Sequence, residues 1–212
     1  MNGTLLTIII ISVIGYLIFA IHFNYKVYKY IWKPGTMVLI ILLAITESGL
    51  SSAFSYLVLF ALLFSLFGDV FLLREEWFVH GLASFLIAHI LYSIGIVVAF
   101  DLRFTFTTSS LLIILMMIAI LFFLILQPNV RKNGGWVLLL AIAGYITVIT
   151  TMVGLSIMTG VSILITASIL FFISDAVLAF NKFVKKFQLA DYIVMSTYFI
   201  AQLLFAISLG GH

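Results

Sequence analysis

Two aspartates lie inside long apolar runs of the sequence, where an ionisable side chain is unusual. Asp69 lies in the run over residues 53–73, and Asp175 lies in the run over residues 161–180. Ionisable groups inside membrane spans are costly, and they usually face an internal cavity. Burial and the nearby carbonyl end of the helix both disfavour the ionised form of each carboxyl. A carboxyl that keeps its proton near neutral pH can act as a general acid.

The two aspartates are expected at similar depth, one to two helical turns from the same face of the membrane. At that depth they could share one cavity and work as an acid and a base. The alternative is that each carboxyl only bonds a neighbouring hydroxyl or basic group and holds the bundle together. The matched depth favours a functional pair.

Four more polar side chains are predicted near the middle of the membrane. His89 and Tyr92 are three residues apart, and Tyr198 and Gln202 are four residues apart, so each pair shares one helix face. Such groups could orient a substrate or a water molecule. Buried tyrosines and glutamines often only bond across helices, and that reading remains open for each of them.

The composition predicts that these residues belong to an integral membrane protein. Of the 212 residues, 65% are hydrophobic and 8% are charged, whereas a soluble domain carries about 25% charged residues. Within lipid, only helices and closed barrels satisfy every backbone group. A barrel strand would alternate polar and apolar residues over roughly ten positions. The apolar runs are instead continuous and of helical length, so the expected fold is all-α.

The apolar runs predict about eight transmembrane helices in a single transmembrane helical domain over residues 1–212. A span needs about 20 apolar residues, and the second run is shorter than that. Pro34 is expected in the first turn of the second helix, where its missing N–H costs little. The expected spans are 4–22, 34–47, 53–73, 78–100, 107–127, 136–156, 161–180 and 188–208.

The positions of the basic residues predict the orientation. With eight spans, nine of the ten lysines and arginines fall on one side, and only Arg103 falls on the other. Because cytoplasmic loops carry an excess of basic residues, this side is expected to be cytoplasmic and both termini external. This distribution of basic residues between the two sides requires an even number of spans. We expect a multi-pass protein of the cell (inner) membrane.

A weak internal similarity appears at an offset of 106 residues. Residues 67–72 align with 173–178, and Tyr92 aligns with Tyr198. Four predicted spans separate the members of each pair, which would make the two halves parallel four-helix repeats. Because apolar helices resemble one another in composition, chance similarity is the alternative.

The sequence predicts no metal site. It contains no cysteine, and the remaining histidines are expected far from His89, without ligand spacing. No aromatic and basic surface for nucleic acid is present. The other five acidic residues are expected to be solvated or to cap helices; they are Glu47, Glu75, Glu76, Asp101 and Asp191.

Four motifs follow one another in an order typical of a known family. They are Gly68-Asp69-Val70-Phe71-Leu72-Leu73, the segment 81–92 that contains His89 and Tyr92, the segment 170–179 that contains Ser174-Asp175, and Tyr198-Phe199-Ile200-Ala201-Gln202. This ordered set, from about residue 33 to 205, resembles the YhhN family, whose characterised members are lysoplasmalogenases. Ala167 departs from the family pattern, which has a glycine there.

The resemblance implies an eight-span enzyme without a cofactor that hydrolyses the vinyl ether bond of lysoplasmalogens. The products would be a fatty aldehyde and a glycerophospho-ethanolamine or -choline. The implied partners are a vinyl ether lysophospholipid and membrane lipids.

Vinyl ether hydrolysis requires a proton donor, a group that activates water, and negative charge near an oxocarbenium ion, as in glycoside hydrolysis. Asp69 and Asp175 are the predicted catalytic residues, and the sequence does not say which is the acid. Lys182 or Lys33 would meet the phosphate. The residues expected to bind or orient the substrate are His89, Tyr92, Ser174, Tyr198, Gln202, Lys182 and Lys33.

Other functions remain open. A small transporter or a lipid-binding protein would also have repeats and polar groups in the middle of the membrane. An intramembrane aspartyl protease also needs two aspartates, but the motifs around them in such proteases are missing. A structural bundle without activity would explain the two aspartates as bonds between helices.

Overall fold

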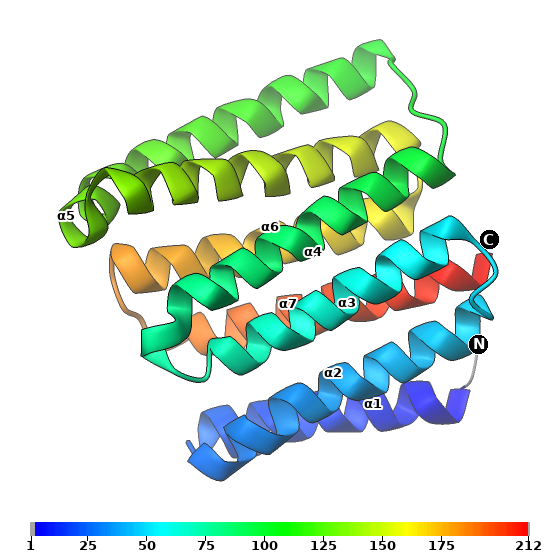
Figure 1. Ribbon diagram of the computed structural model, residues 1–212, viewed down its shortest axis with the longest axis horizontal. Helices are drawn as coiled ribbons and strands as arrows, with labels where there is room; N and C mark the ends of the chain where they lie inside the picture. The colour runs from blue at the N-terminus through cyan, green and yellow to red at the C-terminus, as the bar shows by residue number, and fades with distance from the viewer. Residues whose placement is uncertain (1–2, 212) are drawn as a thin grey trace.

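The computed structural model describes residues 3–211 as an all-α bundle of long, side-by-side helices (Figure 1). No strand occurs among these residues, so the predicted fold class is confirmed. The helices are α1 (Gly3–Gly15) with its π-helical continuation (Tyr16–His22), α2 (Lys26–Ser48), α3 (Ala53–Phe71), α4 (Phe78–Ala99), α5 (Phe106–Thr159), α6 (Ser162–Phe183) and α7 (Ala190–Ile207), with short 3-10 turns at Glu75–Trp77 and Ser208–Gly211.

The number of membrane crossings depends on a bend in α5. Seven helices of the described chain are long and apolar enough to cross a bilayer, counting α1 and its continuation as one. The backbone of the 54-residue α5 leaves the helical conformation at Gly134 and Gly135, where Gly135 has a φ of 64°. Glycine adopts a positive φ without a steric penalty. Figure 1 shows the two arms of α5 folded back on each other, so α5 supplies two antiparallel arms and the count of eight crossings stays a prediction.

The prediction for the second helix was wrong. α2 begins at Lys26 rather than at residue 34, and Pro34 lies in its interior rather than in its first turn. The charged segment before Pro34 was taken for a loop. Lys29 and Lys33 instead stand four residues apart on one helix face and line an internal cavity. In the sequence, the basic residues of a helix face that points into a cavity cannot be told from the basic residues of a solvated loop.

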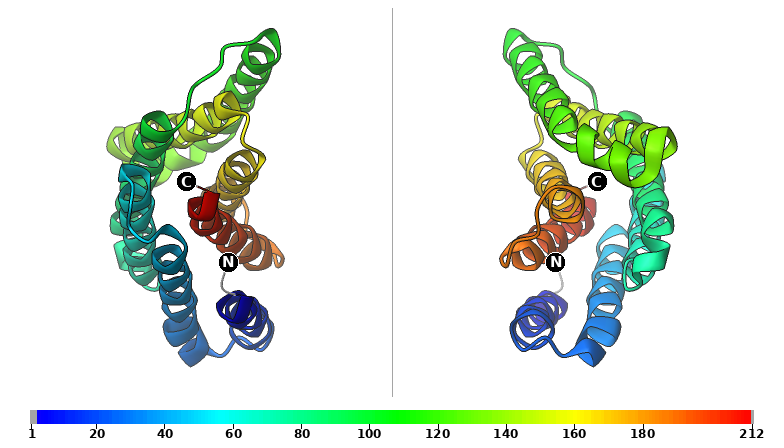
Figure 2. Two further views of the ribbon diagram at one scale, coloured as in Figure 1. Left: turned by 90° about the vertical axis from the view of Figure 1, so that its right-hand side faces the viewer. Right: turned by 90° about the vertical axis from the view of Figure 1, so that its left-hand side faces the viewer.

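The helices form two facing rows when the bundle is viewed from its ends (Figure 2). One row contains α2, α3 and α4, and the other contains α1, α7 and α6. The two arms of α5 lie across one end of the two rows and pack against α4 and α6. This arrangement brings α3 and α6, which carry the two aspartates, toward the interior between the rows.

The helices α3 and α4 approach closely, because small residues of α4 face α3. A Cβ atom added at Gly81 would lie 2.7 Å from Cδ2 of Leu72 and 3.3 Å from the carbonyl oxygen of Gly68. The Ser84 hydroxyl donates a hydrogen bond of 2.6 Å to the carbonyl oxygen of Phe64. Small side chains allow helices to come close in membranes, where packing stabilises their association.

Replacing Gly81 by leucine is expected to destabilise the protein, because the side chain would collide with α3. The expected loss in the free energy of unfolding is about 1–3 kcal/mol, typical of overpacking. Unfolding in detergent micelles measures it. Gly144→Leu is the matched control, since a Cβ there meets nothing within 4 Å. Equal stability of the two variants would contradict the close approach.

Candidate functional site

A polar cavity of about 630 Å³ lies between the two rows, near the end of the bundle that carries most basic residues. Asp69 from α3 and Asp175 from α6 both line it, although they are 106 residues apart in the sequence. The structure therefore places the two predicted aspartates in one cavity. The continuation of α1, together with α2, α4 and α7, supplies other parts of the wall.

Asp69 is held by a charged partner and by a hydroxyl. Its side chain is only 1% exposed, and Nζ of Lys33 lies 2.9 Å from its Oδ1. The hydroxyl of Tyr198 donates a hydrogen bond of 2.7 Å to Oδ2. Burying a carboxylate costs several kcal/mol unless it is paired and hydrogen-bonded. Here Oδ1 has the charge of Lys33 and Oδ2 has the hydroxyl donor of Tyr198.

Asp175 is contacted by a tyrosine hydroxyl and a histidine ring, which meet at one of its oxygens. The hydroxyl of Tyr145 donates to Oδ2 at 2.5 Å, and Nε2 of His89 lies 2.9 Å from the same oxygen. His89 is fully buried, and it also lies 3.0 Å from the hydroxyl oxygen of Tyr145. The side chain of Asp175 is 12% exposed, in contrast to that of Asp69.

Tyr145 was missed by the sequence analysis. It lies in the second arm of α5, 30 residues before Asp175. The only signal was a tyrosine inside an apolar run, and nothing in the sequence showed which helix it would meet.

The two aspartates have equivalent neighbours in the two halves of the chain. Asp69 contacts the second span of its own half through Lys33, and the fourth span of the other half through Tyr198. Asp175 contacts the second span of its half through Tyr145, and the fourth span of the other half through His89. Two parallel repeats would produce this pattern, so it favours the predicted duplication, which stays a prediction.

Three other predicted residues have different surroundings. Ser174 lines the cavity, and its hydroxyl donates to the carbonyl oxygen of Val194 at 3.0 Å. Tyr92 donates to Oε1 of Gln202 at 2.6 Å, and neither residue lines the cavity. This bond joins α4 to α7, which is the structural alternative considered for both residues. Their role in orienting the substrate stays a prediction.

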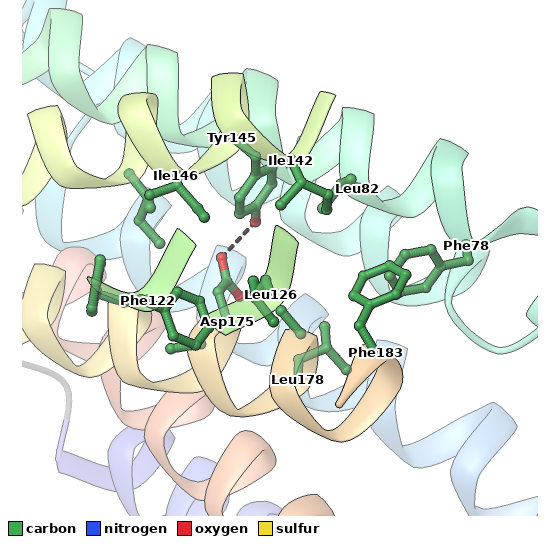
Figure 3. Close-up of a pocket in the computed structure, with 14 residues that line it drawn as sticks. Phe78, Leu82, Phe122, Leu126, Ile142, Tyr145, Ile146, Asp175, Leu178 and Phe183 are labelled. Atoms are coloured by element: carbon green, nitrogen blue, oxygen red, sulfur yellow. Dashed lines mark hydrogen bonds between the residues drawn. The ribbon is translucent and has the colours of Figure 1, made fainter. Parts of the chain in front are cut away.

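A second, apolar pocket begins on the other side of Asp175 (Figure 3). Apart from Tyr145 and Asp175, its lining is hydrocarbon, with Phe122 and Leu126 from the first arm of α5 and Phe183 from α6. The pocket is narrow, with a volume of about 30 Å³. Asp175 therefore stands where a polar cavity and an apolar pocket meet, an arrangement suited to an amphiphilic ligand.

Basic side chains surround the mouth of the polar cavity. Lys29, Arg74, Lys182 and Lys186 line it together with the carboxylates of Glu75 and Asp191. Lys29 lies 3.7 Å from Asp191, and Nζ of Lys182 lies 5.2 Å from the centre of the Phe78 ring. A mouth with excess positive charge attracts anions. Within residues 3–211, no group of three or more His, Asp or Glu side chains is placed to hold a metal ion.

Comparisons with known proteins point to one family. The sequence model of the YhhN family matches residues 28–209. The protein named lysoplasmalogenase TMEM86B of Rattus norvegicus is 31% identical over 178 residues, which are 83% of this chain and 70% of the relative. Its namesake in Sus scrofa is 31% identical over 150 residues, 70% of this chain and 61% of that relative. No solved structure matches the chain.

Replacing Lys33 by methionine is expected to destabilise the fold, because it leaves a buried carboxylate without its counter-charge. Removing one partner of a buried ion pair costs roughly 3–5 kcal/mol, measurable by unfolding in detergent. Adding Asp69→Asn to Lys33→Met should restore most of the loss. Lys29→Met is the control, because its more exposed pair with Asp191 contributes about 0–1 kcal/mol. Equal effects of the two lysine variants would contradict the pairing.

Proposed function

The chain belongs to the YhhN family, and from this membership we propose that it is a membrane hydrolase that cleaves the vinyl ether bond of lysoplasmalogens. The products are a fatty aldehyde and a glycerophospho-ethanolamine or -choline. The observation that carries the proposal is the meeting of Asp69 and Asp175 in one cavity inside a membrane bundle. The names of the two mammalian relatives support the same reaction class.

Two carboxyl groups suffice for this chemistry. A protonated carboxyl delivers its proton to the outer carbon of the double bond, which leaves an oxocarbenium ion. Water then adds to that ion, and the resulting hemiacetal collapses to the aldehyde and the glycerol hydroxyl. The transition state resembles that of glycoside hydrolysis, where a carboxyl pair also acts as acid and base. Asp69 and Asp175 are the proposed pair.

The shape of the site supports a single-chain amphiphile as substrate. We propose that the glycerol head group occupies the polar cavity and that the alkenyl chain leaves through the apolar pocket beyond Asp175. The vinyl ether would then lie between the two aspartates. Lys182 at the cavity mouth would meet the phosphate, since Lys33 is already paired with Asp69.

The orientation follows from the charges. We propose that the protein lies in the cell membrane with the basic end of the bundle facing the cytoplasm. Both termini would then lie on the non-cytoplasmic side. The substrate would enter from the cytoplasmic leaflet, because the cavity lies nearer that end.

The proposal predicts that purified protein releases aldehyde from a vinyl ether lysolipid and not from its ester or alkyl ether counterpart, without any gradient. Asp69→Asn and Asp175→Asn should each lower the rate by about 10²–10⁴-fold, the usual contribution of acid–base catalysis. Asp101→Asn is the control, because Asp101 lies at the other end of the bundle between α4 and α5. A pure transporter would release no aldehyde, and full activity in either aspartate variant would exclude this mechanism.

Replacing Lys182 by alanine should raise KM for the phosphate-bearing substrate with little change in kcat. A partly screened ion pair of about 1 kcal/mol corresponds to roughly a fivefold change. Steady-state kinetics at low salt measure it, and Lys132→Ala, near the bend of α5, is the control. A fall in kcat at constant KM would place Lys182 in a different role.

A further inference from the structure

The groups around Asp69 favour its ionised form in the resting protein. The Lys33 ammonium forms an ion pair with Oδ1, and the Tyr198 hydroxyl donates a hydrogen bond to Oδ2. The Lys33 side chain is 11% exposed, so a neutral Asp69 would leave a nearly buried ammonium without its counter-charge. The geometry fits an ionised carboxylate that remains ionised in the resting protein.

The donors around Asp175 are arranged differently. Tyr145 and His89 both approach Oδ2, and Oδ1 has no hydrogen-bond partner among residues 3–211. Figure 3 shows one carboxyl oxygen aimed at Tyr145 and the other turned away from it. Unlike Asp69, Asp175 forms no ion pair with a lysine or arginine of the described chain.

The surroundings of His89 favour a neutral ring with its proton on Nε2. Its Nδ1 is buried without a partner among the described residues, whereas Nε2 faces Asp175. A charged imidazolium would bury an unsatisfied N–H at Nδ1, which is costly. A neutral ring with its proton on Nε2 satisfies the contact, because that nitrogen then donates to Oδ2.

From these contacts we infer that Asp175 is the proton donor through Oδ1, that Asp69 is the carboxylate of the resting protein and the base for water, and that His89 and Tyr145 are positioning residues of Asp175. The inference rests on the proposed function and assigns the roles that the sequence left open. Tyr145 and His89 fix Oδ2, so that Oδ1 alone carries the proton and points toward the bound double bond.

The proton balance closes over one turnover. Asp175 gives its proton to the outer alkene carbon and becomes a carboxylate, while Asp69 stabilises the oxocarbenium ion and takes a proton from the attacking water. The hemiacetal hydroxyl then returns a proton to Asp175. Asp69 protonates the ether oxygen as the carbon–oxygen bond breaks, and the starting protonation states are restored.

Chemical rescue distinguishes the two roles. Alanine at position 175 or 69 removes a carboxyl, and added formate buffer supplies a small replacement at constant total concentration and varied pH. We expect the rescued rate of Asp175→Ala to follow the concentration of formic acid, and that of Asp69→Ala to follow the concentration of the formate anion. The variant Lys33→Met/Asp69→Ala, which buries no unpaired ammonium, repeats the second arm if Asp69→Ala folds poorly.

The reverse dependence, or no difference between the two positions, would overturn the assignment of roles. The wild-type protein is assayed in parallel without formate. Absence of aldehyde from the wild type would instead remove the proposed function, so the two failures are distinguishable.

The positioning role has its own test. Tyr145→Phe and His89→Asn should each lower kcat about tenfold, the value of one strong hydrogen bond, with KM unchanged. Neither should lower the rate further when Asp175 is already alanine, because both act through that residue. Tyr56→Phe and His80→Asn are controls on exposed faces of α3 and α4. A further loss in the Asp175→Ala background, or a change in KM alone, would overturn the positioning role.

Discussion

The cost of placing a carboxyl group in an apolar interior without hydrogen-bond partners determines the arrangement of this bundle. Each aspartate inside the membrane region needs donors, and the donors come from other helices. Asp69 is satisfied by α2 and α7, and Asp175 by α4 and the second arm of α5. A buried charge or polar group without a partner is costly. These contacts therefore determine how α2, α3, α4, α6, α7 and the second arm of α5 meet around one cavity.

The same contacts explain why the cavity is polar within an otherwise apolar protein. Side chains that face lipid gain nothing from polarity, and many large apolar residues are exposed on the outer surface. Polar groups therefore gather on the inner faces, where they can bond one another. Each aspartate is held by both halves of the chain, so neither half alone assembles the site. If the two halves arose by duplication, a dimer of the ancestral four-helix protein would already have formed such a shared site.

The sequence predicted the elements better than it predicted their neighbours. Apolar runs of helical length located the spans and both aspartates, because the bilayer imposes length and hydrophobicity on each span. The same uniform hydrophobicity hides which face of a helix points inward, so Tyr145 could not be paired with Asp175. Lys33 was taken for a loop residue near phosphate, whereas it pairs with Asp69 inside the bundle. Partners across helices are set by packing, which leaves no local pattern in such runs.

The most direct measurement of the central claim is hydrolysis of a vinyl ether lysolipid by the purified protein in D₂O, with immediate trapping of the aldehyde. Proton transfer from an aspartic acid in exchange with solvent places one deuterium on the carbon next to the aldehyde carbonyl, and mass spectrometry should find it there. Aldehyde without that label, or no aldehyde from folded protein, would contradict a mechanism in which two aspartates inside the bundle protonate and hydrate the double bond.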